Sequence, residues 1–485
     1  MLWLRFTTRG KYMKTVVCIR QSADGEINPF DASAYETALR IKGAEITLLS
    51  MGPPKTAAFL QNLTRLGAKD AVLLTDKAFA GADTLATAYT LGLAVKRLAP
   101  ALIICGRQSV DGDTGQVGPA LSITAGYRLL TNVMSIAACS DKITCINRAG
   151  KTISAMTPAL ITVEKSLNLR LPSIRSKITP VRIFGASDLN ADLSRCGLNG
   201  SPTRVVKTFE NNVDRRRCTF ISIAELKAAI EMGLGKGAKK IAPSASEKKL
   251  KNIWIAGEVA RGAAQTVGEN ITVFPIDSPA KTAQRIRNGK PDAVLWDGNA
   301  ISKAIAPQVA ALLKTGLCAD CTSLETDGDT LYMYRPACSG NVIAKIRCVT
   351  APPMATVRTA KQEQRSIIFG IGFGARESVC EIKAIADKIG AGIAATRKMV
   401  DGDYLPYNIQ VGLTGESINP DVYIALGISG AVHHIAGIRQ SGTIIAVNSD
   451  REAPIFKFAD FGIIADVKDV LRNFLSPNNQ KIFVR

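Results

Sequence analysis

The stretch Ile367-Ile368-Phe369-Gly370-Ile371-Gly372-Phe373-Gly374-Ala375 is a short apolar run that leads into alternating glycines. Behind it, Val379, Ile382, Ile385 and Ile389 recur at helical spacing. The pattern predicts a buried strand, a tight turn and a helix, the unit that builds doubly wound parallel sheets. Glycines at such a turn let backbone N–H groups approach a phosphate at the helix N-terminus. The spacing is not GxGxxG, so a purely structural turn explains the glycines equally well.

The same alternation of strands and helices recurs throughout the chain. Apolar runs typical of buried strands occupy residues 46–49, 71–74, 102–105, 253–256, 293–296, 422–425 and 444–447. Residues 33–42, 55–67 and 82–97 have helix-like spacing between the first of these strands. We predict an α/β protein with two doubly wound, nucleotide-binding-type parallel-sheet domains and a C-terminal Rossmann-like domain. Ligands of such sheets bind at the carboxyl ends of the strands.

The 485 residues are too many for one core, and changes in composition suggest where the domains divide. We expect a first domain over residues 13–235, a linker over 236–251 and two further domains over 252–362 and 363–475. Residues 236–251 are rich in Gly, Lys, Ser and Ala, a composition typical of flexible linkers. Met13 directly precedes the first strand, so residues 1–12 are either a tail or an extension that is not translated.

Composition favours a cytoplasmic protein that binds no nucleic acid and crosses no membrane. The net charge of +20 is spread along the chain without an aromatic-basic RNA motif or a long basic helix. No apolar run approaches the length that a membrane helix needs. The 11 cysteines and the absence of a secretion signal suggest reduced thiols. Cys318 and Cys321 form an isolated CxxC, for which we expect small residues at a strand end and no metal site.

A series of motifs in the last quarter of the chain is far more specific. It runs through Thr396-Arg397, residues 410–415 (QVGLTG), 427–437 (GISGAVHHIAG), 446–450 (AVNSD) and 459–462 (ADFG). In order and wording it resembles the FAD domain of electron transfer flavoprotein α subunits.

Motifs in the first two thirds of the chain resemble the same family. Residues 28–31 (NPFD), 50–53 (SMGP) and 106–119 (GRQSVDGDTGQVGP) resemble the β subunit. Residues 316–321 (GLCADC) and 335–341 (RPACSGN) resemble the first domain of the α subunit, shortened here. The resemblance covers roughly residues 13 to 475 and implies the two subunits fused, β-like half first.

For the α-like half, the resemblance implies an FAD site and assigns roles within it. Arg397 would stabilise negative charge on the reduced flavin, Thr414 would donate near flavin N5, and His434 would reach the flavin O2 side. The remaining implied FAD contacts are Gly372, Gly374, Arg376, Thr396, Gln410, Gly412, Gly415, Ser429, Gly430, His433, Asn448 and Asp466. For each of these residues, the alternative to FAD contact is a structural role in a turn, at a helix cap or on the surface.

Three departures from the family pattern fall inside this site. His433 and Leu413 each replace a glutamine, and Phe373 stands where an arginine usually follows the paired glycines. The change at Phe373 removes a phosphate-binding charge, which Arg376 could replace. We therefore expect the site to persist with altered flavin affinity or redox tuning.

For the β-like half, the resemblance leaves the nucleotide open between a second FAD and AMP. The sequence Asp-Gly-Asp-Thr at 111–114 favours FAD and an electron-bifurcating type with NADH as the electron donor. With AMP at this position, the chain would be a single-FAD shuttle. Gly112 and Gly115 would allow backbone approach to the nucleotide. The implied contacts are Cys18, Asn28, Asp31, Met51, Gly52, Asp111, Asp113, Thr114, Gln116, Val117 and Gly118.

The resemblance also implies redox partners. These are an acyl-CoA-type or other flavin dehydrogenase and an acceptor such as ferredoxin, flavodoxin or a quinone oxidoreductase. Residues 164–174 occupy the place of the partner-recognition loop, although alternating Leu167, Leu169 and Leu171 fit a buried strand equally well. A rival of another class is a nucleotide-binding scaffold or sensor without redox function.

Overall fold

The computed structural model describes residues 12–210, 216–236, 246–337, 342–358, 366–412 and 415–475. The chain forms two compact units. Unit 1 contains residues 1–209, 244–338 and 343–358, and unit 2 contains residues 210–243, 339–342 and 359–485. Within the described ranges, no helix is both long enough and apolar enough to cross a membrane.

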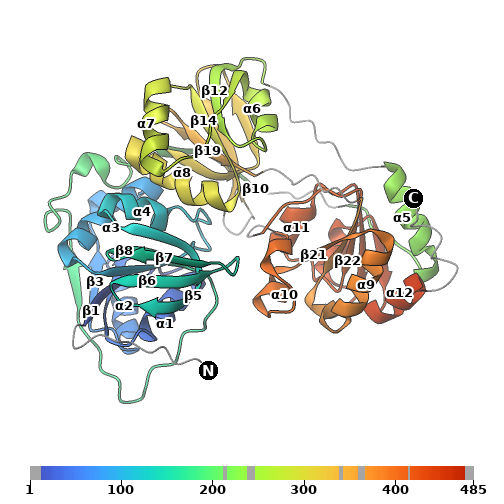
Figure 1. Cartoon of the computed structure of the whole chain (residues 1–485), viewed down its shortest axis with the longest axis horizontal. Helices are drawn as coiled ribbons and strands as arrows, with labels where there is room; N and C mark the ends of the chain where they lie inside the picture. The colour runs from blue at the N-terminus through green and yellow to red at the C-terminus, as the bar shows by residue number, and fades with distance from the viewer. Residues whose placement is uncertain are drawn as a thin grey trace. The chain divides into compact units, whose positions relative to one another are not determined.

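The largest sheet of unit 1 has nine strands (Figure 1). In spatial order they are β7 (Thr152–Met156), β6 (Lys142–Asn147), β5 (Arg128–Cys139), β8 (Ala159–Val163), β4 (Leu102–Gly106), β1 (Met13–Cys18), β2 (Ala44–Met51), β3 (Asp70–Leu74) and β9 (Val181–Phe184). All neighbours pair in parallel except at the edge, where β5, β6 and β7 are antiparallel. The predicted parallel sheet is thus confirmed.

Helices cover both faces of this sheet (Figure 1). On one face lie α1 (Pro29–Leu39) and α2 (Thr56–Thr64), and on the other lie α3 (Thr84–Leu98) and α4 (Val117–Ala125). Successive strand residues point to opposite faces, so Val17 packs with α1 and α2 while Val16 packs with α3 and α4. Burial on both faces explains why these strands are continuous apolar runs.

The strand order fixes where unit 1 can bind a ligand. β1 pairs with β2 on one side and with β4 on the other, so the chain reverses its winding direction between β1 and β4. Doubly wound sheets bind nucleotides in the crevice at this point, outside the carboxyl ends of the strands. The loops that follow Cys18 and Gly106 meet there.

Unit 1 contains two further sheets. A five-stranded parallel sheet consists of β13 (Gly268–Val273), β12 (Leu250–Ala256), β14 (Ala293–Asp297), β19 (Met354–Val357) and β15 (Leu317–Cys321), with helices α6 (Arg261–Val267), α7 (Pro279–Gly289) and α8 (Ala300–Leu313). A four-stranded sheet consists of β10 (Thr203–Glu210), β18 (Val342–Cys348), β17 (Leu331–Ala337) and β16 (Ser323–Thr326). β10 precedes the expected linker and the other three strands follow it, so the two halves of the chain share this sheet.

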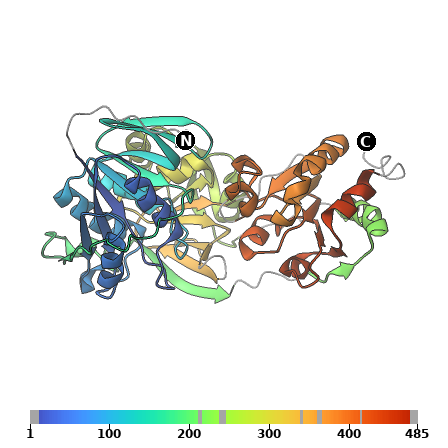
Figure 2. The same cartoon turned by 90° about the horizontal axis from the view of Figure 1, so that it is seen from below.

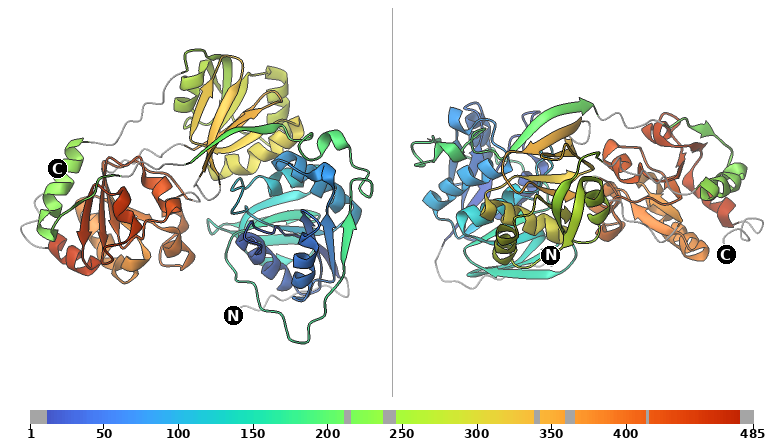
Figure 3. Two further views of the ribbon diagram at one scale, coloured as in Figure 1. Left: turned by 180° about the vertical axis from the view of Figure 1, so that it is seen from behind. Right: turned by 90° about the horizontal axis from the view of Figure 1, so that it is seen from above.

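Unit 2 is built on a six-stranded sheet (Figure 3). Its strands are β11 (Thr219–Phe220), β24 (Phe461–Ile464), β23 (Thr443–Asn448), β22 (Val422–Leu426), β20 (Ile367–Ile371) and β21 (Gly392–Ala395). α9 (Val379–Ile389), α12 (Val467–Leu475) and α5 (Leu226–Lys236) pack on one face, and α11 (Val432–Ile438) packs on the other. The short α10 (Arg397–Asp401) follows β21. Because β20 pairs with both β21 and β22, the winding reverses between β20 and β22.

Residues 216–236 precede the expected linker yet form part of unit 2 (Figure 2). β11 extends the sheet beside β24, and α5 packs so closely that a side chain at Gly233 would meet Val422. Arg216 anchors the segment, because its guanidinium pairs with Asp460 and donates to the carbonyl oxygens of Ser441 at 2.7 Å and Gly442 at 3.0 Å. The sheet of unit 2 therefore includes a strand from the first half of the chain.

We expect Arg216→Met to destabilise unit 2 by roughly 2–3 kcal/mol, because it removes the cation paired with Asp460 and the donor to the carbonyls of Ser441 and Gly442. Urea unfolding monitored in the purified chain measures this. Arg217→Met is the matched control, since the neighbouring side chain is exposed. Equal destabilisation by both substitutions would show that Arg216 does not anchor the segment.

Candidate functional site

At the carboxyl edge of unit 2, the loops that follow β20 and β22 pack backbone against backbone. Gly372 N–H donates to the Leu426 carbonyl at 2.8 Å, and Gly374 N–H donates to the Gly427 carbonyl at 3.1 Å. A Cβ at Gly372 would lie 2.2 Å from the Gly427 oxygen. The glycines of this turn therefore serve loop packing. Phosphate contact by Gly372 and Gly374 remains a prediction.

The segment around Gln410 forms a tight turn beside α11. Gly412 has φ of +141°, a conformation that other residues rarely adopt. A Cβ at Gly415 would lie 2.1 Å from the Gln410 carbonyl oxygen, and one at Gly437 would lie 2.5 Å from the Gly412 nitrogen. Gln410 is buried. Thr414, the predicted N5 donor, lies outside the described residues.

Thr396 and Arg397 follow the end of β21. The Thr396 hydroxyl oxygen is buried and has no hydrogen-bond partner among the described residues. A buried polar atom without a partner is costly, so a bound group at this edge would satisfy it. Arg397 pairs with Asp401 one helical turn along, at 3.1 Å, and its side chain is about a third exposed. Arg397 is thus both paired and partly exposed.

His434 is buried between two partners from the protein itself. Its Nδ1–H donates to the Val411 carbonyl at 3.1 Å, so Nε2 accepts from the Tyr423 hydroxyl at 3.0 Å. Burial lowers the pKa of His434 to about 4. The ring is therefore neutral near pH 7. The predicted flavin contact would require one of these two bonds to exchange.

Lowering the pH from 6.5 to 4 should destabilise unit 2 through His434. Over this range the unfolded chain binds a proton at His434 that the folded chain excludes, so stability is lost as the pH falls, by up to about 3 kcal/mol. We expect His434→Gln to flatten this slope in pH-dependent urea unfolding. His433→Gln is the control, because His433 is exposed and is the only other histidine. An unchanged slope in His434→Gln would contradict the burial of a neutral ring.

The other predicted residues of unit 2 have structural roles that the fold already explains. Asn448 Nδ2 donates to the Ile428 carbonyl at 2.9 Å, and Asp466 caps α12 by accepting from Lys468 N–H at 2.8 Å. Gly430 has φ of +90°. Ser429, which precedes α11, and His433, in its first turn, are exposed. All lie at or just beyond the carboxyl ends of the strands, with Asn448 ending β23 and His433 in the first turn of α11, and their contacts to FAD remain predictions.

At the carboxyl edge of unit 1, Asp31 and Asn28 tie together the loops after β1 and β4. The Asp31 carboxylate accepts from Arg20 N–H at 2.8 Å and from Gly106 N–H at 3.1 Å. Burial raises the pKa of Asp31 to about 7. Asn28 donates to the Gln108 carbonyl at 2.9 Å. Asp31 and Asn28 thus link the loop that follows β1 to the loop that follows β4.

The loop 107–116 is held from the other half of the chain by Arg335, which begins the motif 335–341 but to which the sequence analysis gave no role. The buried Arg335 guanidinium donates to the carbonyl oxygens of Ala319 at 2.9 Å, Gly112 at 2.9 Å and Asp113 at 3.2 Å. Asp113 has φ of +48° and Gly115 has φ of +64°, so the loop turns sharply where it is clamped. The pKa of the Asp113 carboxyl is raised, by burial first and then by Asp320.

A second group of charges that sequence reasoning missed lies at the start of this loop. Glu164 accepts from Arg107 and Arg148, each at 3.1 Å, and all three side chains are largely buried. Arg107 Nη2 has no hydrogen-bond partner in the described part of the chain. Two guanidinium groups around one carboxylate give these three side chains together a net positive charge.

The other predicted residues of the β-like half divide between this crevice and the packing around it. Cys18 and Met51 are the last residues of β1 and β2. The Asp111 carboxylate lies 3.5 Å from Arg20 Nε, and the Gln116 N–H donates to the Thr114 hydroxyl at 3.5 Å. Val117 begins α4. Side chains at Gly52 and Gly118 would meet Thr56 and Thr162, so these glycines serve packing.

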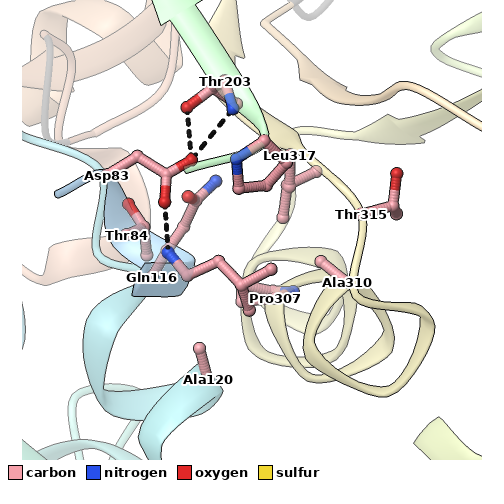
Figure 4. A pocket seen from close by; sticks show the side chains of 11 residues that line it. Asp83, Thr84, Gln116, Ala120, Thr203, Pro307, Ala310, Thr315 and Leu317 are labelled. Atoms are coloured by element: carbon pink, nitrogen blue, oxygen red, sulfur yellow. Dashed lines mark hydrogen bonds between the residues drawn. The ribbon is translucent and has the colours of Figure 1, made fainter. Parts of the chain in front are cut away.

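Gln116 lines a small cavity between α4 and α8 (Figure 4). The cavity has a volume of about 20 Å³, and Asp83, beside it, accepts from Thr203 and from Leu85 N–H. Gln116 Nε2 is buried without a partner among the described residues. The cavity has room for about one water molecule and is too small for a nucleotide.

Both units therefore have the architecture of nucleotide-binding α/β proteins, with polar residues gathered where the strand order reverses. Comparison with known proteins specifies the class. The electron transfer flavoprotein domain matches residues 15–189 and 279–368, more than half of the chain, and the electron transfer flavoprotein FAD-binding domain matches residues 361–439. The chain belongs to the electron transfer flavoprotein family.

Individual relatives match one half of the chain each. The electron transfer flavoprotein subunit beta of Thermoanaerobacterium thermosaccharolyticum is 40% identical over 41% of this chain and 82% of its own length. The subunit alpha of the same organism is 36% identical over 38% of this chain and 69% of its own length. Protein FixA of Azorhizobium caulinodans is 36% identical over 44% of this chain and 84% of its own length. The chain is thus similar to both subunits, consistent with a fusion.

Proposed function

We propose that the FAD of this electron transfer flavoprotein lies at the β20/β22 edge of unit 2. The residues that would hold it are Thr396, Arg397, Gln410, Gly412, Thr414, Gly415, Ser429, His434, Asn448 and Asp466, with Gly372, Gly374, Gly430 and His433 lining the loops. The observation that supports this most is the Thr396 hydroxyl, which is buried and unpaired beside an accessible guanidinium. FAD supplies one- and two-electron chemistry, while the chain positions it and supplies charge.

We further propose that residues 13–235 and 252–475 correspond to the two subunits, joined by residues 236–251.

We also propose that the β-like half of the chain holds a nucleotide. The single observation that carries this proposal is the loop 107–116, which closes over the β1/β4 edge and is fixed by Asn28 and Arg335. A loop held in advance costs less entropy when a ligand binds.

The nucleotide that we propose here is a second FAD, with NADH as the electron donor. The wording Asp-Gly-Asp-Thr supports FAD, and the positive charge of Arg107 and Arg148 around Glu164 suits a dinucleotide phosphate or an anionic reduced ring. NADH would deliver a hydride at this half, and single electrons would leave along two routes, one through unit 2. With AMP in its place, the chain would be a single-FAD shuttle.

Anaerobic titration with NADH tests this function. A chain with FAD in the β-like half should lose its visible flavin absorbance on addition of stoichiometric NADH. A yellow chain that NADH does not bleach, although dithionite does, would support the single-FAD shuttle. A colourless chain that takes up no FAD would favour the nucleotide-binding scaffold.

Membership of the family implies a dehydrogenase partner, and we propose that residues 164–174 contact it. The alternating leucines form no strand here, because this segment runs irregularly between β8 and β9. Leu171 and Ile174 are 89% and 99% exposed, whereas Arg170 anchors the segment by donating to Glu36 at 2.8 Å. Apolar side chains held out in this way are typical of protein contact sites.

Replacing both Leu171 and Ile174 by serine should slow electron exchange with the dehydrogenase at least about tenfold, since central apolar contacts dominate such interfaces. Stopped-flow mixing of the two proteins measures the rate. Cofactor content and unfolding should not change, because neither side chain packs on the core. Unaltered exchange kinetics would place the partner elsewhere.

A further inference from the structure

Phe373 is surrounded by two cations and a second aromatic ring. The Lys398 ammonium lies 4.0 Å from the centre of the Phe373 ring, and the Arg376 guanidinium lies 4.7 Å from it. Tyr404 meets the same ring edge-on at 6.1 Å. We call Phe373, Arg376, Lys398 and Tyr404 the cation cluster. It brings together residues from two segments, the turn after β20 and the segment after β21 that contains α10 and Tyr404.

The cation cluster lies at the edge of unit 2 where the strand order reverses. β20 and β21 pair in register up to Ile371 and Ala395, so the segments that follow both strands leave the sheet side by side. Phe373 is two residues beyond the end of β20, and Lys398 is three beyond the end of β21. Dinucleotides bind outside the carboxyl ends of the strands at this reversal.

The charges of the cation cluster are poorly compensated. Lys398 has no carboxylate partner in the part of the chain that the structure describes. Among the described residues, the carboxylate that Arg376 pairs with is Glu377, at 3.4 Å, and Glu377 is shared with Lys468 at 3.0 Å. Phe373 is half-buried and the Lys398 side chain is exposed, so the ammonium can exchange its contact with the ring for an anion of a ligand. Two such cations on one ring form a place for a phosphate group.

We propose that Lys398 and Arg376, positioned by Phe373, bind the diphosphate of the FAD in unit 2. The proposal rests on the FAD location proposed above. Phe373 lacks the charge of the arginine expected at its position, but its ring gathers two charges from neighbouring segments. Lys398 thereby supplies a phosphate contact from α10. It directly follows Arg397, which we place at the flavin ring, so one short helix would contact both the diphosphate and the flavin ring of FAD.

The test is the FAD affinity of the purified full chain after removal of its cofactors, measured by flavin fluorescence at low and high salt. Lys398→Gln should weaken FAD binding at least roughly tenfold at low salt, because a charge-assisted bond to phosphate is lost. The loss should shrink at high salt, where ions screen the charge. Lys398→Arg should retain the affinity, and Phe373→Leu should weaken it by a smaller factor.

Lys388→Gln is the matched control, since Lys388 lies in the last turn of α9, away from the carboxyl ends of the strands. It should bind FAD like the wild type. An unchanged affinity in Lys398→Gln, or a loss that is the same at both salt concentrations, would overturn the role of Lys398. A wild-type chain without FAD affinity in unit 2 would overturn the FAD location and this inference together.

Discussion

Replacing Arg335 by methionine should lower the affinity of the β-like half for its nucleotide by about one to two orders of magnitude, while FAD in unit 2 stays bound. The substitution removes three bonds from a buried guanidinium to carbonyl oxygens, two of them on the loop that closes the crevice. Bonds to charged donors contribute about 1.5–3 kcal/mol each, and a loop freed in this way must be ordered again on binding.

The chain contains its own controls for this experiment. FAD affinity in unit 2 reports whether the protein as a whole has been disturbed. Arg347→Met removes the same charge from an exposed position on β18 and should leave the nucleotide in place. Arg335→Lys keeps the charge, but a lysine cannot reach several carbonyls at once. Its nucleotide affinity should therefore be close to that of the methionine variant. Nucleotide affinity equal to wild type in Arg335→Met would show that the clamp does not govern the crevice.

Replacing Arg397 by alanine should lower the reduction potential of the flavin in unit 2, by roughly 60–120 mV for a one-electron step. A fixed positive charge 4 Å from a negative one stabilises it by about 4 kcal/mol near a protein surface, before desolvation is counted. Asp401 partly neutralises Arg397 at 3.1 Å, so the expected effect is smaller, about one to two factors of ten.

Spectroelectrochemical titration measures the potential. Arg397→Lys should retain part of the shift, because the charge remains while its planar geometry is lost. Arg472→Ala, which removes an exposed charge from α12, should leave the potential unchanged. An unaltered potential in Arg397→Ala would remove Arg397 from the flavin site.

Sequence periodicity was sufficient to locate the buried strands at the centre of the first sheet. The strands at 46–49, 71–74 and 102–105 lie within β2, β3 and β4, because strands buried on both faces must be apolar throughout. The first helix begins at Pro29 and not at residue 33, and proline in the first turn was the signal for this start. The motifs also placed both candidate sites on loops at the strand ends, since a doubly wound fold gathers those loops.

Contacts between distant parts of the chain could not be predicted in the same way. Arg335 binds carbonyls 222 and 223 residues away, and the carbonyl groups that it recognises leave no mark in the sequence. The two-residue strand β11 is too short to show periodicity, so nothing indicated that residues 216–236 pack in unit 2. The leucine alternation at 167–171 was misleading as a strand signal, because these residues pair with no neighbouring strand. In each case a tertiary contact, and not local pattern, decides the structure.

The amount of FAD and AMP released per chain tests the central claim most directly. The claim is one FAD in unit 2 and a second at the β1/β4 edge of unit 1. Denaturing the purified chain, after reconstitution with excess FAD, and separating the nucleotides should give two FAD and no AMP. One FAD and one AMP per chain would contradict the second flavin and identify the chain as a single-FAD shuttle.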